Sequence, residues 1–92
     1  MQENKNIEFK REYTENIYKE IVAFLNSYSS MIFIGYDDDG TLIGLINSKV
    51  IKERISNEIT GKITPDCSIF VSINNCSLED KQYITLKSLR EI

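Results

Sequence analysis

The stretch that decides the fold runs from Ala23 to Leu45 and has the sequence AFLNSYSSMIFIGYDDDGTLIGL. Within it, Met31 to Tyr36 is a short apolar run bounded by turn residues, which is typical of a buried strand. Asp39-Gly40 is a strong hairpin signal, because aspartate tolerates a positive φ and glycine favours one. We therefore expect Met31–Tyr36 and Leu42–Leu45 to pair as antiparallel strands around an acidic turn.

The residues before this stretch predict a strand and a helix. Ile7 to Lys10 has the length and composition of a short strand. Thr14 is a suitable N-cap, since its hydroxyl can accept a hydrogen bond from an early helical N–H. From Glu15 to Asn26 apolar residues recur at helical spacing, which predicts a helix with one apolar face. That apolar stripe consists of Ile17, Ile21, Phe24, Leu25 and Tyr28.

The residues after it predict a second helix that begins at Ser48. Its apolar stripe consists of Ile51, Ile55 and Ile59. Gly61 suits the position just after a helix, and Pro65 prevents the helix from continuing.

Two further strands complete the predicted fold. Apolar and polar residues alternate from Ser68 to Asn74, and Gln82 to Lys87 follows a polar turn at Ser77–Asp80. The order is strand, helix, two strands, helix, two strands. We therefore predict an α+β fold in a single domain over residues 1–92. It has a five-stranded mixed, largely antiparallel sheet with two helices packed on one face.

Composition excludes several kinds of chemistry. The chain has 92 residues, a net charge of −3, two cysteines and no histidine. Without histidine it has no Ser-His or Cys-His pair and no ordinary structural zinc site. Cys67 and Cys76 flank a predicted strand that would hold them about 30 Å apart, whereas a disulfide needs Cα atoms about 5.5 Å apart. We expect free thiols, and with them a cytoplasmic protein.

No membrane association is expected from the sequence. The stretch Met1–Lys5 is polar, unlike a signal peptide, and no apolar run approaches the length of a membrane span.

Basic residues gather on the second predicted helix. Residues 46–65 hold four Lys/Arg (Lys49, Lys52, Arg54 and Lys62) against two Glu, a local charge of +2. These side chains could contact the phosphates of DNA or RNA, or they could be an ordinary solvated helix face. The same choice applies to Lys10 and Arg11, which could instead protect an edge strand from aggregation.

Two tyrosines border the central stretch and are candidates for stacking on nucleic-acid bases. Tyr28 precedes the predicted buried strand and Tyr36 ends it. Aromatic side chains in this position can stack on bases. The alternative is that both are half-buried core or interface residues.

The motifs of the central stretch resemble those of the Schlafen AlbA-like domain family. They are Ala23-Phe24-x-Asn26, then the apolar strand, Gly35-x-Asp37-Asp38-Asp39-Gly40 and Ile43-Gly44, with Glu8-Phe9-Lys10 upstream. The resemblance covers the chain from Glu3 to Leu86. It implies the fold given above and a DNA-binding role, in transcription regulation or defence. One departure is Ser29-Ser30, where the family commonly has a Gly-Gly pair.

The resemblance also implies a metal site. Some nuclease members of the family use three acidic residues, which fall on Glu3, Glu8 and Asp38 of this sequence. Converging carboxylates can hold Mg²⁺ or Mn²⁺, which generates hydroxide and binds a phosphate. The alternative for the acidic run is a solvated hairpin turn, and no cofactor is then expected.

Three functions therefore remain open. The first is a small nucleic-acid-binding domain, which exposed sheet edges and a modest core predict to be a homodimer. The second is a metal-dependent nuclease that uses Glu3, Glu8 and Asp38. The third is a protein–protein interaction module, which the acidic sequence pI of about 4.9 favours.

Overall fold

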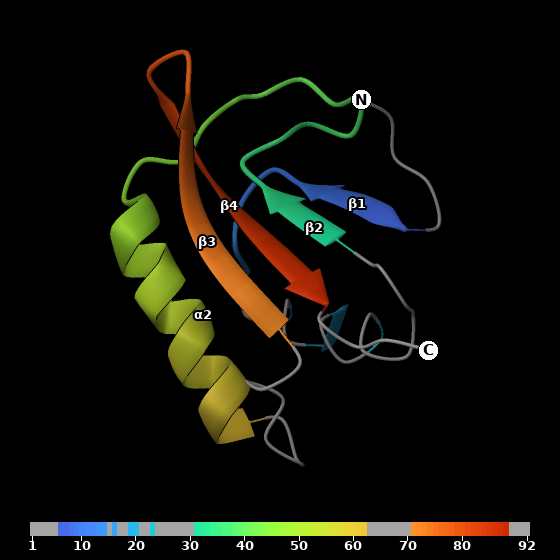
Figure 1. Cartoon of the computed structure of the whole chain (residues 1–92), viewed down its shortest axis with the longest axis vertical. Coiled ribbons are helices and arrows are strands. Elements are labelled where there is room, and N and C mark those ends of the chain that lie inside the picture. The colour runs from blue at the N-terminus through green and yellow to red at the C-terminus, as the bar shows by residue number, and fades with distance from the viewer. Residues whose placement is uncertain are drawn as a thin grey trace.

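A computed structural model of the chain describes residues 6–14, 16, 19, 20, 23, 31–62 and 71–88. In this part of the chain four strands and one helix are defined: β1 (Ile7–Lys10), β2 (Met31–Ile34), α2 (Ser48–Lys62), β3 (Val71–Leu78) and β4 (Lys81–Ser88). The strands form one sheet in the order β1-β2-β4-β3, and α2 runs along its β3 side (Figure 1). The predicted α+β class and mixed sheet are confirmed.

Strand β2 lies inside the sheet because both of its edges are paired. It pairs in parallel with β1 and antiparallel with β4, so that Ile34 lies opposite both Lys10 and Ile84. Its side chains are buried on both faces, with Ile32 and Phe33 at 2% and 8% exposure. A strand covered on both faces is expected to be a nearly continuous apolar run, as Met31–Ile34 is.

The predicted hairpin is wrong beyond its turn. The turn itself closes, and Tyr36 and Leu42 form an isolated antiparallel bridge. Leu42–Leu45 does not continue as a strand along β2, because β1 and β4 already occupy both edges of β2. The segment instead follows the end of β4, where the Leu45 N–H donates to the Gln82 carbonyl at 2.8 Å. The sheet of the described residues therefore has four strands where five were predicted.

Helix α2 begins at Ser48, as predicted, and packs against the sheet through Ile55, which is fully buried. The predicted first helix, Glu15 to Asn26 with Phe24, lies mostly outside the described residues. Of its residues Lys19, Glu20 and Ala23 are described and have helical backbone. The described part of the chain thus defines one helix where two were predicted.

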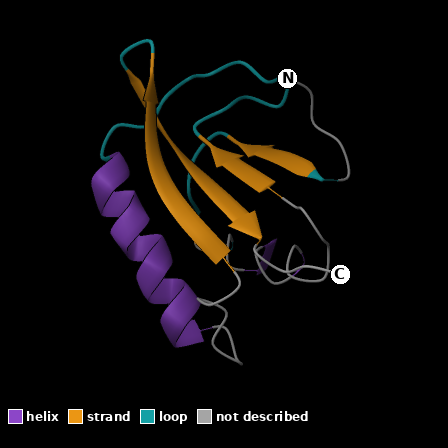
Figure 2. Ribbon diagram, viewed as in Figure 1, coloured by secondary structure: helices purple, strands orange, loops and turns teal. Residues whose placement is uncertain are grey.

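Strands β3 and β4 form a tight hairpin (Figure 2). Glu79 and Asp80 make its turn, both with positive φ, at 52° and 63°. Two central residues with positive φ give the turn whose twist matches that of the flanking strands. Strand β3 consequently extends to Leu78, beyond the predicted end at Asn74, and β4 begins at Lys81.

The sheet separates two groups of buried side chains. On the α2 face, Ile55 packs with residues of β2 and β4; the buried members of that group are Ile32, Ile34, Ile55, Ile84 and Leu86. The opposite face carries an aromatic cluster of Phe9, Phe33 and Tyr36, with Tyr83 packed against it. Because successive strand residues point to opposite faces, β2 supplies side chains to both groups.

Candidate nucleic-acid interface

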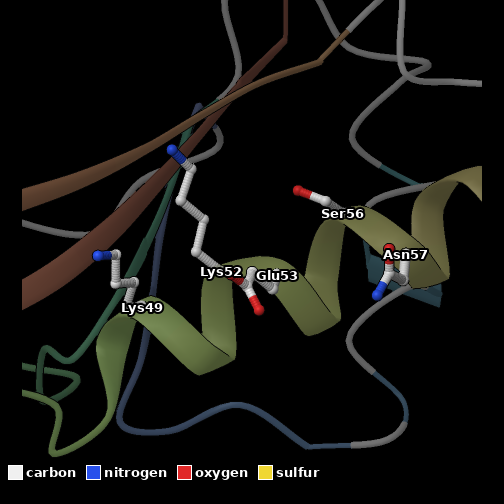
Figure 3. A pocket seen from close by; sticks show the side chains of 5 residues that line it. All are labelled: Lys49, Lys52, Glu53, Ser56 and Asn57. Atoms are coloured by element: carbon white, nitrogen blue, oxygen red, sulfur yellow. The ribbon is translucent and has the colours of Figure 1, made fainter.

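Two lysines lie side by side on the first two turns of α2. Lys49 and Lys52 are three residues apart, which places them next to each other on a helix surface. Figure 3 shows their side chains leaving α2 on the same side, together with that of Ser56. They line a depression of about 440 Å³ along with Glu53, Ser56 and Asn57. Among the described residues no carboxylate forms a salt bridge with either ammonium group.

The start of α2 adds to the positive potential of this surface. Its first turn contains no acidic residue. The Ile51 N–H donates to the Asn47 carbonyl at 3.0 Å, and the buried Ser48 hydroxyl lies 3.5 Å from the Gln82 Oε1 atom. The N-terminal end of a helix carries a partial positive charge and favours anions. The two lysines therefore add to the electrostatic field of a helix N-terminus, which itself attracts phosphate. The contact with Gln82 fixes this start of α2 to β4.

Arg54 belongs to a different side of the helix. It is turned about 140° around the helix axis from Lys49. Its guanidinium lies over the Tyr13 ring, 5.2 Å from the centroid, and its Nε atom is 3.6 Å from a Glu58 carboxylate oxygen. The structure therefore separates the predicted basic set, with the two lysines together and Arg54 packed against the loop after β1.

The other two predicted basic contacts are engaged in ion pairs. The Lys10 Nζ atom lies 2.7 Å from a Glu20 carboxylate oxygen, and Arg11 lies 3.5 Å from an Asp37 carboxylate oxygen. A hydrogen bond from Glu8 lowers the pKa of Glu20, burial raises it, and Lys10 lowers it further, with a net downward shift. A phosphate at Lys10 or Arg11 would have to compete with these carboxylates.

The acidic turn is closed by its own hydrogen bonds. The Asp37 carboxylate accepts from the Asp38 N–H, and the Asp39 carboxylate accepts from the Thr41 N–H, both at 2.9 Å. The hydrogen bonds with Thr41 lower the pKa of Asp39. Asp38 is exposed to solvent. Asp37 and Asp39 thus serve the turn itself.

The predicted metal ligands are placed only in part. Glu8 lies on β1, half-buried and beside Glu20, whereas Asp38 lies in the exposed turn after β2. Glu3 lies outside the described residues. Within those residues no group of three or more His, Cys, Asp or Glu side chains is arranged to hold a metal ion. The three-carboxylate site stays a prediction.

Tyr36 lies in the aromatic cluster on the face of the sheet opposite α2. It is 6% exposed, stacked on Phe9 at 5.6 Å between ring centroids and in edge contact with Phe33 and Tyr83 at 5.3 and 5.2 Å. To stack on a base, its ring would have to leave this cluster. The other stacking candidate, Tyr28, lies outside the described residues.

The sequence interpretation did not assign Ser56 or Asn57 to the binding surface, and both line the same depression as the lysines. Helical spacing could have indicated them, because Ser56 follows Lys52 by four residues and so extends the same row along α2. Two polar side chains that can donate or accept hydrogen bonds therefore continue the cationic surface. The thiol of Cys76 is free, as expected, and Cys67 lies outside the described residues.

Comparison with known proteins identifies the chain at the level of a family. The model of the family described as Schlafen, AlbA_2 matches residues 3–90. No curated protein and no solved structure matches the chain. In the described residues, no helix has the length and apolar character needed to cross a membrane.

Proposed function

We propose, because this chain belongs to the Schlafen, AlbA_2 family, that it is a small nucleic-acid-binding domain that contacts phosphates through the first two turns of α2. A homodimer with a role in transcription regulation or defence is part of this proposal. The residues that carry the contact are Lys49 and Lys52, with Ser56 and Asn57 beside them.

The observation that supports this proposal best is the pair of lysines without carboxylate partners among the described residues. Two other lysines of the described chain are engaged: Lys10 pairs with Glu20, and the Lys81 Nζ atom donates to the Leu42 carbonyl at 3.2 Å. A phosphate that binds an unpaired ammonium displaces only water and counterions, whereas one that binds a paired ammonium must also break an ion pair. Lys49 and Lys52, which lie side by side at the start of α2, are therefore favoured over Lys10 and Lys81.

The test is a titration of labelled mixed-sequence DNA and RNA, followed by fluorescence anisotropy at about 50 mM salt. The variant is Lys49→Glu with Lys52→Glu. The matched control is Lys19→Glu with Lys87→Glu, which changes the net charge equally at two other exposed positions. We expect the first variant alone to lose binding, to a similar extent for unrelated sequences, because phosphate contacts carry no sequence information.

The salt dependence gives a second measurement of the same contact. For DNA, the slope of log K against log salt should fall by roughly 0.9 for each lost phosphate contact. Equal losses in both variants would mean that binding follows net charge and not this surface. Absence of wild-type binding would reject the nucleic-acid function and favour the interaction module.

A parallel titration with Mg²⁺ or Mn²⁺ tests the nuclease alternative. Cleavage that appears only with the metal and disappears in Asp38→Asn would assign the acidic turn to metal binding. Binding without cleavage in both conditions is the result expected for a domain that binds nucleic acid and does not cut it.

A further inference from the structure

Strand β3 is an edge of the sheet that lacks the usual protection against further pairing. It is the last strand in the order β1-β2-β4-β3, and no strand of the described residues pairs with its outer side. Natural edge strands are commonly short, or they carry charged residues or proline. The other edge, β1, has four residues with Glu8 and Lys10 among them, whereas β3 has eight residues without a charge or a proline. Strand β3 is therefore open to pairing with another strand.

Helix α2 covers only the first part of β3. Val71 and Ile73 pack against the buried group that contains Ile55. The following residues, 74–78, are exposed except for the half-buried Cys76. Figure 1 shows this end of β3 extending past the start of α2. The accessible edge is therefore the segment 74–78, which is centred on Cys76.

The backbone of this segment directs its hydrogen-bonding groups outward at two residues. Opposed residues of an antiparallel pair alternate between those that exchange hydrogen bonds and those that do not. The two-residue turn is closed by a hydrogen-bonded pair that includes Leu78. The N–H and C=O groups of Asn75 and Ser77 consequently point away from β4. The Gln82 carbonyl, opposite Ser77, fits this alternation because it accepts from the Leu45 N–H and not from β3.

We propose that segment 74–78 pairs antiparallel with the same segment of a second copy, about a two-fold axis at Cys76. This inference rests on the homodimer of the proposed function and names its interface. In this register Asn75 of each copy lies opposite Ser77 of the other, so that outward N–H groups meet outward carbonyls and each such pair exchanges both of its hydrogen bonds. The register uses the whole accessible edge, because Cys76 is its midpoint.

A second copy suits this edge better than a foreign peptide. Two identical strands bring their own charges together near the axis, and like charges directly opposite each other destabilise a strand pair. Strand β3 has no charge to oppose the approach. Leu78, which is 50% exposed, falls opposite Asn74 of the second copy and is covered by it. A foreign strand is selected by pockets for its side chains, whereas Asn74, Asn75 and Ser77 are small polar residues that would not select one sequence.

The pairing also places the two phosphate surfaces on one side of the dimer. Opposed residues of an antiparallel pair carry their side chains on the same face of the sheet. The sheets of the two copies therefore continue into each other with both α2 helices on the same face. A nucleic acid long enough to reach both helices would contact Lys49 and Lys52 twice, and the second contact would profit from a high effective concentration.

Oxidative cross-linking tests the position of the axis. Cys67 is replaced by serine, so that Cys76 is the remaining thiol of the chain, and diamide is the oxidant of the two thiols. Directly opposite residues at a non-hydrogen-bonded position have Cα atoms about 4.5 Å apart, which lies within the range of a disulfide. The matched control is Cys67→Ser with Cys76→Ser and Asn74→Cys. Its thiol is at a more exposed position, but the two copies of residue 74 lie about 14 Å apart along the strands.

A proline substitution tests the hydrogen bonds. Asn75→Pro removes an N–H that β4 does not use, and proline is tolerated in an edge strand where the N–H faces solvent. Asn75→Ala keeps this N–H and is the matched control. In light scattering over a series of protein concentrations, we expect the dimer dissociation constant to rise at least about tenfold in Asn75→Pro. Asn75→Ala should match wild type, and urea midpoints of both variants check that they fold.

We expect a covalent dimer from Cys76 and none from the thiol at position 74. Equal cross-linking at the two positions would reflect random collision and overturn the register. A dimer that persists unchanged in a folded Asn75→Pro would overturn the inference; if this variant does not fold, the comparison of the two thiols decides alone. A monomeric wild type would overturn both the inference and the homodimer. The phosphate surface is judged separately, by the anisotropy titration of the lysine variant.

Discussion

The attachment of α2 to the sheet depends on Ile55, and its truncation gives a quantitative test of the packing. Ile55 is fully buried among Ile34, Ile84 and other residues of the α2 face. Ile55→Ala removes three carbon atoms, worth about 0.8 kcal/mol each in transfer free energy. The cavity left behind adds to this, so the expected loss lies within about 2–5 kcal/mol. A domain of this size has a total unfolding free energy of about 5–14 kcal/mol.

Urea denaturation followed by circular dichroism measures this loss. With an m value of about 1–3 kcal/mol/M, a loss of about 3 kcal/mol lowers the midpoint by at least ~1 M. Ile46→Ala is the matched control, because it makes the same chemical change at a side chain that is 89% exposed. The unfolding free energy of this control should change by less than about 0.5 kcal/mol. Similar shifts for the two variants would refute the placement of Ile55 in the core.

Three further predictions concern backbone, pH and assembly. Gly35 has φ of 108°, and a Cβ added there would lie 3.2 Å from a Leu45 atom and 3.2 Å from a Tyr83 atom. Gly35→Ala should therefore lower the urea midpoint, because the backbone strain alone costs about 1–3 kcal/mol. The pKa of Glu20 is lowered from 4.5, so Glu20 stabilises the fold above that pH, and this stabilisation is lost as the pH falls through the lowered pKa. In Glu20→Gln the urea midpoint should therefore depend less on pH below 4.5, and an unchanged pH profile would contradict this. We expect a dimer mass by light scattering at tens of micromolar protein, and a monomer mass would refute the predicted homodimer.

The parts of the fold that were predictable are those fixed by local sequence. Met31–Ile34 is apolar at every position, and Ile51 and Ile55 mark the face of α2 that meets the sheet. Strand β4 was also predicted almost to its ends. In β2 a continuous apolar run marks a strand covered on both faces, whereas in α2 the helical period marks the buried face.

The strand order was not predictable in the same way, because it is set by competition between distant segments. Asp39-Gly40 does close a turn, as its composition indicates, but the chain after it cannot pair with β2. Strands β1 and β4, which come from opposite ends of the sequence, take both edges of β2. The residues of a turn predict that turn, but they do not indicate which strands pair with the two edges of β2.

The sequence identified the basic residues of the candidate site, but not which of them lie together on one surface. The sequence indicated a basic second helix, but only the helix rotation shows that Arg54 faces Tyr13 while Lys49 and Lys52 remain together. Similarly, a tyrosine after an apolar strand has no feature that reveals the three aromatic rings around Tyr36. Those contacts join β1, β2 and β4, which are far apart in sequence.

The net charge of −3 is a poor guide to what this surface attracts. Three carboxylates of the described residues are paired within the fold: Glu20 with Lys10, Asp37 with Arg11, and Glu58 with Arg54. Each such pair removes one positive and one negative charge from the outer field, which falls off within about 8–10 Å at physiological salt. A ligand then meets the charges that remain locally, and on the first two turns of α2 these are two ammonium groups and the Glu53 carboxylate, beside a helix N-terminus. An acidic protein can therefore present a local cationic surface where basic side chains outnumber acidic ones on one element.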